Sequence, residues 1–260
     1  MQTESHIHLI LPLSGPIRLD PTAFPKRFLE RWGFQIACGE TPKLANDRLA
    51  HAFLAGDGNR NAVVTTVDQK LPAALTDLLL SPMIPLAPAE ADGIRSHRAA
   101  ARIDYLFGNA PPKQAVELCS QLLLSLFQFG EVQGFANLAA QSYRPRGSIP
   151  PELLSSQPLD PDVLSFLFVS TQAVTEPSSL VVHTHGMEQF ALPNLEVPFP
   201  AGASIPHAHS TVLAVAADIL GRGTAPSPGE SFHLQDHPRV LRAVSLKEDP
   251  DHPSGLMTFA

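Results

Sequence analysis

The sequence has little charge, few aromatic side chains and almost no cysteine. Charged residues make up 17% of the 260 positions and aromatic residues 7%, mostly Phe. The formal net charge of −7 leaves no excess of basic residues to neutralise phosphates, so the composition disfavours binding to nucleic acid or to an anionic membrane surface. With two Tyr and one Trp, the chain also lacks an aromatic platform on which single-stranded bases stack.

Long apolar runs and paired cysteines are also missing. The most apolar stretch, Leu118–Phe129, is interrupted by polar residues, which is typical of a buried helix rather than a membrane span. The first residues, MQTESHIHL, lack the basic and long apolar regions of a signal peptide. Cys38 and Cys119 lie far apart and form no disulfide framework. We therefore expect a cytoplasmic protein with reduced thiols.

Proline and histidine are abundant instead. The 26 prolines are about twice the usual share of ~5%. They cluster at 81–88, 111–112, 145–161, 193–206 and 226–228, where helices and strands are expected to begin or end. This spacing indicates a folded domain with many loops rather than a disordered linker.

Strands and helices alternate along the chain. Residues 6–13 alternate between apolar and other positions, which predicts a strand, and the apolar stripe 24–32 predicts a helix. A strand over 99–107, a helix from Pro112 to about Phe129 and a strand within 132–140 form a predicted strand–helix–strand unit. These patterns predict an α+β protein whose mixed, largely antiparallel sheets pack against helices.

The second half is expected to contain a hairpin, 164–175 with 180–187, and a helix that begins near Ser204. The proline-rich stretch 81–93 is interpreted as a linker. Two organisations are therefore open: a single domain over 1–260, or two sublobes, 1–90 and 91–260.

The segment Leu180–Val197, LVVHTHGMEQFALPNLEV, is the most distinctive part of the chain. It contains Thr184, Gly186 and Met187, followed by a Leu-Pro-x-Leu-Glu pattern that ends at Glu196. It resembles the hallmark of a bacterial family, domain of unknown function 4261, and the order of elements is similar over most of the chain. That family has no assigned activity, so the resemblance implies a fold and no catalytic residue.

Eleven histidines include three His-x-His pairs. The pairs are His6 and His8, His183 and His185, and His207 and His209. On a strand, residues two apart share a face about 6.5–7 Å apart and can share a metal, whereas on a helix they diverge by about 200°. The first pair is interpreted as a solvated strand face and the last as polar residues at a helix start.

The middle pair gives a candidate metal site of His183, His185 and Glu196. The layout is similar to the His-x-His and Ser-x-x-Asp signature of zinc isopeptidases of the JAMM class, with Glu196 at the aspartate position. Pro193 and Gly186 stand where that signature has serine and proline. The other interpretation is a histidine pair with a structural role.

Arginines form the second group of candidate residues. Arg144 and Arg146 follow a predicted strand, and Arg95, Arg98 and Arg102 lie around the start of another. If they converge they could hold a carboxylate or phosphate through two hydrogen bonds, although separate solvated arginines are the simpler interpretation.

The sequence leaves two functions open. The first is a non-catalytic module that binds a protein partner, with candidate binding residues Thr184, Gly186, Met187, Arg144 and Arg146. The second is a zinc-dependent hydrolase centred on the middle histidine pair, for which Glu176 and Glu152 are the candidates for a general base. No other cofactor is predicted.

Overall fold

The computed structural model describes residues 7–40, 50–56, 59–81, 86–107, 110–155, 159–233, 240–249 and 252–260. The chain divides into two compact units. The N-terminal unit comprises His6–Leu138 and Ser142–Pro158, and the C-terminal unit comprises Met1–Ser5, Ala139–Gln141 and Leu159–Ala260. Both units pack helices against mainly antiparallel sheets, so the predicted α+β class is confirmed.

The N-terminal unit is built on a seven-stranded sheet with the order β2-β3-β4-β5-β1-β6-β7. Its strands are β1 (His8–Leu13), β2 (Ala37–Glu40), β3 (Ala50–Gly56), β4 (Asn61–Val67), β5 (Ala99–Phe107), β6 (Gly134–Asn137) and β7 (Ser142–Pro145). Every neighbouring pair in this sheet is antiparallel. Because β1 lies between β5 and β6, those two strands run parallel, as the predicted strand–helix–strand unit requires.

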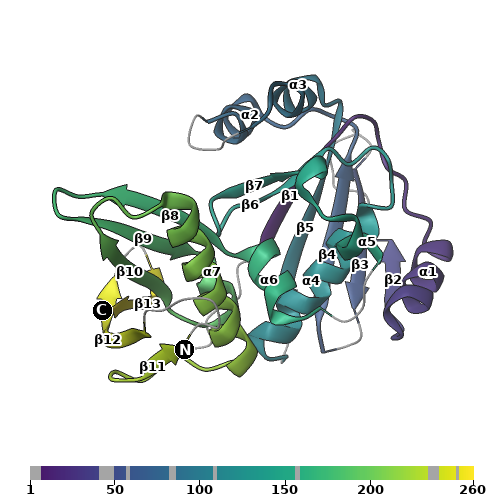
Figure 1. Ribbon diagram of the computed structural model, residues 1–260. Helices are drawn as coiled ribbons and strands as arrows, with labels where there is room; N and C mark the ends of the chain where they lie inside the picture. Colours follow the sequence, from purple (N-terminus) through teal and green to yellow (C-terminus); the bar gives the residue numbers. More distant parts are fainter. Residues whose placement is uncertain are drawn as a thin grey trace. The chain divides into compact units, whose positions relative to one another are not determined.

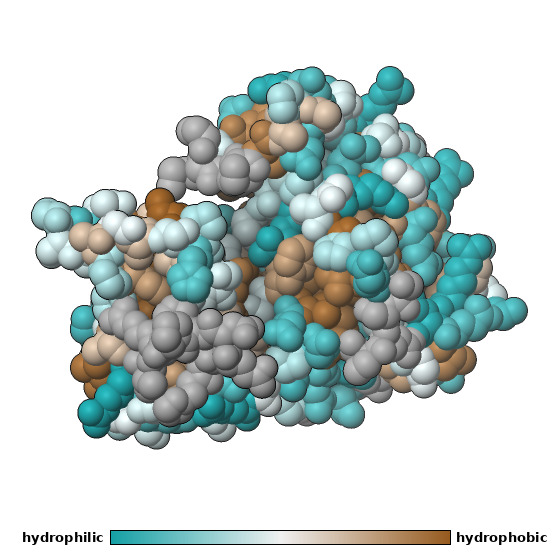
Figure 2. All heavy atoms as spheres, viewed as in Figure 1, coloured by the Kyte–Doolittle hydropathy of each residue, from teal (hydrophilic) through white to brown (hydrophobic). Residues whose placement is uncertain are grey.

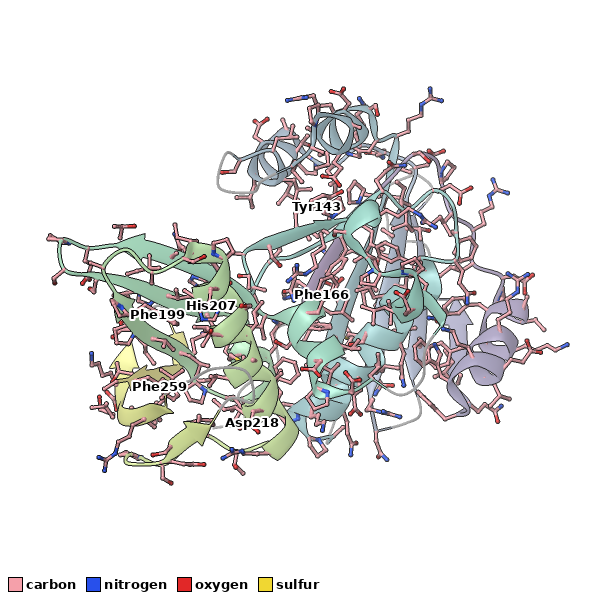
Figure 3. All side chains as sticks on the ribbon, in the orientation of Figure 1. Tyr143, Phe166, Phe199, His207, Asp218 and Phe259 are labelled. Carbon is pink, nitrogen blue, oxygen red and sulfur yellow. The ribbon has the colours of Figure 1, made fainter. Side chains whose placement is uncertain are left out.

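Helices cover both faces of this sheet (Figure 1). They are α1 (Ala23–Trp32), α2 (Ala73–Leu79), α3 (Pro88–Ser96), α4 (Pro112–Leu126) and α5 (Pro151–Ser155), with a 3-10 turn, η1, at Arg146–Ser148. Phe127, directly after α4, meets Phe135 of β6 edge to face. The next residue, Ala136, packs with Tyr143 in a core beneath α2 and α3 (Figure 3). Successive strand residues point to opposite faces, so α4 lies on one face and α2 and α3 on the other.

The C-terminal unit is built on a six-stranded sheet with the order β11-β12-β13-β10-β9-β8. Its strands are β8 (Ser170–Thr175), β9 (Ser179–His185), β10 (Asn194–Pro200), β11 (Ser231–His233), β12 (Val240–Asp249) and β13 (His252–Phe259). Its helices are α6 (Pro161–Phe168) and α7 (Ile205–Arg222), with a 3-10 turn, η2, at Met187–Phe190. Pairing is antiparallel except between β10 and β13.

One long helix covers one face of the C-terminal sheet. α7 packs against β8, β9 and β10, as Figure 1 shows. Its apolar side chains meet the buried residues of those strands, and Phe199 and Phe259, marked in Figure 3, belong to the same core. The opposite face of this sheet carries polar side chains among apolar ones, since His183, His185 and Glu196 alternate with the core residues of β9 and β10.

Two sequence predictions about elements were wrong. Residues 164–168, predicted as the first part of a strand, belong to α6, because Asp160 accepts a hydrogen bond from the Val163 N–H and so caps a helix that begins at Pro161. The predicted linker 81–93 contains most of α3, which starts at Pro88 and is supported by Glu90 accepting from the Ala87 N–H. The rest of the linker includes residues 82–85, which lie outside the described residues.

The division between units also lies elsewhere than near residue 90. β4 and β5, which flank that position, pair side by side in one sheet, so residues 61–107 belong to the same unit. Among the described residues, no helix combines the length and hydropathy needed to cross a bilayer.

Candidate functional site

The face of the C-terminal sheet away from α7 carries the predicted metal ligands. His183 on β9 lies directly opposite Glu196 on β10, with 3.8 Å between Nδ1 and Oε2. Both side chains are about a quarter exposed, at 25% and 28%. Lys247 Nζ lies 3.8 Å from the other oxygen of Glu196. An imidazole, a carboxylate and an ammonium group therefore lie in a row, each partly exposed to solvent.

His185 lies on the same face of β9 but has a different neighbour. Its Nε2 lies 3.4 Å from Oε1 of Gln172 on β8. Among the residues that the structure describes, no three His, Cys, Asp or Glu side chains are grouped closely enough to hold a metal ion. The zinc site of His183, His185 and Glu196 therefore stays a prediction.

Neither of the two candidate general bases belongs to this row of side chains. Glu176 lies in the turn between β8 and β9, where it accepts a hydrogen bond from the Ser179 hydroxyl at 2.8 Å. Glu152 belongs to α5, in the N-terminal unit.

The Thr184–Leu195 segment forms a tightly hydrogen-bonded turn. The Thr184 hydroxyl donates to Asn194 Oδ1 at 3.2 Å and accepts from the Leu195 N–H at 2.8 Å. Asn194 Oδ1 also accepts from the Met187 N–H at 3.3 Å, and its amide nitrogen donates to Glu188 at 2.8 Å. Thr184 and the Met187 side chain are fully buried, so in this conformation they stabilise the turn.

Gly186 allows that turn to form. Its φ of +104° lies in the region that favours glycine, and a Cβ atom there would come within 2.0 Å of the Phe168 carbonyl oxygen. The close approach of two backbone segments explains why a residue without a side chain is needed here. A binding role for Thr184, Gly186 and Met187 stays a prediction.

Of the two predicted loop arginines, Arg146 is held by main-chain carbonyls. It donates to the carbonyl oxygens of Phe127 at 3.1 Å, Phe129 at 3.0 Å and Val132 at 3.2 Å, just beyond the C-terminus of α4. A cation at a helix C-terminus satisfies unpaired carbonyls and the negative end of the helix dipole. Arg144 lies on β7 opposite Phe135, where burial lowers its pKa to about 10.

Arg95 and Arg102 have separate partners, whereas Arg98 lies between α3 and β5. Arg95 pairs with Asp92 on the same helix, at 3.0 Å, and Arg102 pairs with Asp104 on β5, at 2.5 Å. The last His-x-His pair lies in the first turns of α7, where His209 Nδ1 is hydrogen-bonded to the Thr171 hydroxyl of β8. Desolvation lowers the pKa of His209. His6 lies outside the described residues.

A feature that the sequence did not reveal is the edge of the C-terminal sheet. β8 is the last strand in the order, and its six residues, Ser170–Thr175, contain no charged residue and no proline. The Glu176 N–H bonds the Ser179 carbonyl across the hairpin. Glu176 and Ser179 are therefore a hydrogen-bonded pair, and along an antiparallel ladder such pairs alternate with pairs that are not hydrogen-bonded. Thr171, Ala173 and Thr175 fall in the second kind of pair, so their N–H and C=O groups point away from β9.

The outward main-chain groups of β8 are not paired with another strand of the described chain. Among the described residues, no loop or side chain makes a hydrogen bond to the main-chain groups of Thr171, Ala173 or Thr175. In Figure 2 the surface over this hairpin, at the left, mixes pale atoms with brown ones, in keeping with the 43% exposure of Val174. The sequence signal that could have found this edge is the uncharged, β-branched run STQAVT before a turn.

Comparison of the chain with known protein families, with curated proteins and with solved structures found no match. The resemblance to domain of unknown function 4261 therefore stays a prediction.

Proposed function

We propose that the protein is a non-catalytic module that binds an extended segment of a partner protein along β8. In this mode of recognition, called β-augmentation, a peptide adds a strand to an open sheet edge. Main-chain hydrogen bonds then provide affinity and alternate side chains provide specificity.

The observation that carries the proposal is the contrast between β8 and the other sheet edges. In the described part of the chain, β11 has three residues, while β2 and β7 have four each and contain Glu40 and the Arg144-Pro145 pair. Short strands, charges and prolines are the usual means by which proteins prevent unwanted pairing at an edge. β8 has six residues and none of these features.

The surroundings of β8 favour a particular kind of partner. The exposed side chains Gln172 and Val174 would lie beside the partner strand, on the face that also carries His183 and His185. An uncharged edge with one apolar side chain fits a β-branched or aromatic peptide better than a highly charged one. The net charge of −7 argues for a protein partner and against nucleic acid or an anionic membrane.

We also infer a cytoplasmic location. Cys119 is buried in α4 as a free thiol, and burial raises the pKa of that thiol. Buried reduced cysteines suit a reducing compartment.

The experiment uses a displayed library of extended ten-residue peptides, selected against the whole protein. Selected peptides should slow hydrogen exchange at the amides of Thr171, Ala173 and Thr175. Ala173→Pro removes one outward N–H and should weaken binding by about tenfold or more, since one lost donor leaves the peptide's carbonyl unpaired.

Ala173→Ser is the matched control, because it changes the side chain and keeps the N–H. It should bind as the unsubstituted protein does. The proposal fails if no peptide is selected, or if selected peptides bind the proline variant as tightly as the serine variant.

A further inference from the structure

A group of three polar side chains lies on the sheet of the N-terminal unit, far from β8 in the sequence. Asp104 and Arg102 are two apart on β5, so they share a face, and His8 on β1 lies directly opposite Asp104. His8 Nδ1 lies 2.7 Å from one carboxylate oxygen of Asp104, and Arg102 Nε donates to the other oxygen at 2.5 Å.

The three side chains differ sharply in exposure. The Asp104 side chain is 10% exposed, while those of His8 and Arg102 are 44% and 60% exposed. A buried carboxylate is costly unless both oxygens are hydrogen-bonded, and here each oxygen has one partner. The result is a fixed carboxylate beneath an exposed guanidinium.

The two terminal nitrogens of Arg102 make no hydrogen bond to a described residue. Asp104 is the one partner of the Arg102 guanidinium among the described residues, and it engages Nε. The two terminal nitrogens form a planar fork of N–H donors, which matches the paired oxygens of a carboxylate or a phosphate. An exposed ion pair adds little to stability, so stability alone does not explain a guanidinium held in this way.

Arg102 has a hydroxyl and apolar side chains among its neighbours. Thr65 on β4 lies opposite Arg102 and is half-buried, and Leu106, further along β5, is 44% exposed. On the other side, Ile10 lies opposite Arg102 and belongs to the core beneath α2 and α3. Strands β1, β4 and β5 therefore place one positioned cation beside one hydroxyl and near apolar side chains.

We propose that Arg102 binds the oxyanion group, carboxylate or phosphate, of a small-molecule ligand at this face. Arg102 contacts the ligand, while Asp104 and His8 are positioning residues that fix the guanidinium. The site lies in the N-terminal unit and is independent of peptide binding at β8.

The test is a titration of the whole isotope-labelled protein with inorganic phosphate and, separately, with acetate. Arginine Nε–H resonances are followed by NMR. The Arg102 resonance should shift saturably with at least one of the two anions. Stronger binding of phosphate would identify a phosphorylated ligand, and stronger binding of acetate a carboxylic acid.

Substitutions of Arg102 distinguish anion binding by its planar fork of N–H donors from binding by its positive charge alone. Arg102→Gln should weaken binding by about tenfold or more, because charge-assisted hydrogen bonds are lost. Arg102→Lys keeps the charge without the fork and should weaken binding by about threefold or more.

Arg95→Gln is the matched control, since Arg95 is 61% exposed and pairs with Asp92, which is itself 74% exposed. It should leave binding unchanged. The proposal is overturned if neither anion shifts the Arg102 resonance saturably, if Arg102→Lys binds as tightly as the unsubstituted protein, or if Arg95→Gln weakens binding as much as Arg102→Gln.

Discussion

At the scale of single residues, Gly186 is the position most sensitive to change. A side chain there meets two penalties, the φ of +104° and the approach of a Cβ atom to 2.0 Å from the Phe168 carbonyl oxygen. We expect Gly186→Ala to lower the free energy of unfolding by about 3 kcal/mol or more, measured by urea denaturation.

Gly202→Ala separates the two penalties. Gly202 has a φ of +82°, but no atom lies within 4 Å of a Cβ placed there. Its substitution should cost about 1–2 kcal/mol, which is the cost of the left-handed conformation alone. Equal losses in the two variants would contradict the role of the Phe168 contact.

His209 is expected to make stability depend on pH. Desolvation lowers its pKa in the folded protein, so the unfolded chain binds the proton more tightly. Stability is therefore complete above the unfolded value of about 6.5 and falls as the pH drops below it, towards the lower folded pKa. In urea denaturation at pH 7.5 and about 5.5, His209→Gln should lose less stability between the two conditions than the unsubstituted protein.

The zinc hypothesis is tested by measuring the metal content of the purified protein. A catalytic zinc needs three protein ligands, and the described residues offer only the facing pair of His183 and Glu196 with His185 turned to Gln172. We expect dialysed, untagged protein to contain zinc far below one atom per chain by elemental analysis. Stoichiometric zinc that disappears in a His183→Ala/His185→Ala variant would contradict this expectation.

The sequence predicts residue roles that depend on the local sequence pattern. It does not predict roles that depend on which strands become neighbours in a sheet. The helix predicted over 24–32 is confirmed, and it ends at Gly33, whose φ is +73° and whose N–H donates to the Leu29 carbonyl. The pairing of His8 with Asp104 joins positions 96 apart, and no local pattern indicates which strands become neighbours. The sequence therefore suggested Arg102 as a candidate without indicating the carboxylate that fixes it.

At the scale of elements, α4 depends on Arg146. This side chain bonds three carbonyl oxygens beyond the last turn of the helix and lies over the Phe127 ring, 5.8 Å from its centroid. Arg146→Met keeps most of the side-chain volume but leaves partly buried carbonyls unpaired, which should cost about 2 kcal/mol in urea denaturation. Arg95→Met, which breaks an exposed pair, should cost less than about 0.5 kcal/mol.

Two elements were misjudged for a common physical reason. The segment 164–169, LSFLFV, is short and apolar, and such a run fits a buried strand and a buried helix equally well. The deciding signal was Asp160 followed by Pro161, a helix start that lies outside the apolar run. In the same way, Pro88 and Glu90 mark the start of α3 within a stretch whose prolines suggested a linker.

At the scale of the whole molecule, the two units share one chain in an interleaved order. Ala139–Gln141 belong to the C-terminal unit, although the residues on both sides belong to the N-terminal sheet. The Ser170 hydroxyl donates to the Ala140 carbonyl, and the Ala140 Cβ lies close to where a side chain at Gly186 would be. The assignment of these three residues depends on contacts with residues far away in the sequence, so local sequence patterns do not indicate it.

Each unit has its own sheet and its own core, so each should respond separately to damage. Hydrogen exchange of the native protein tests this with a reciprocal pair of variants. Gly186→Ala should speed exchange in β9 and β10 while leaving β4 and β5 unchanged, because the strained turn belongs to the C-terminal sheet. Arg146→Met should speed exchange in β4 and β5 while leaving β9 and β10 unchanged, because the contacts of Arg146 support α4 in the N-terminal unit. Equal acceleration in both sheets by either variant would instead mean that the chain unfolds as one cooperative domain.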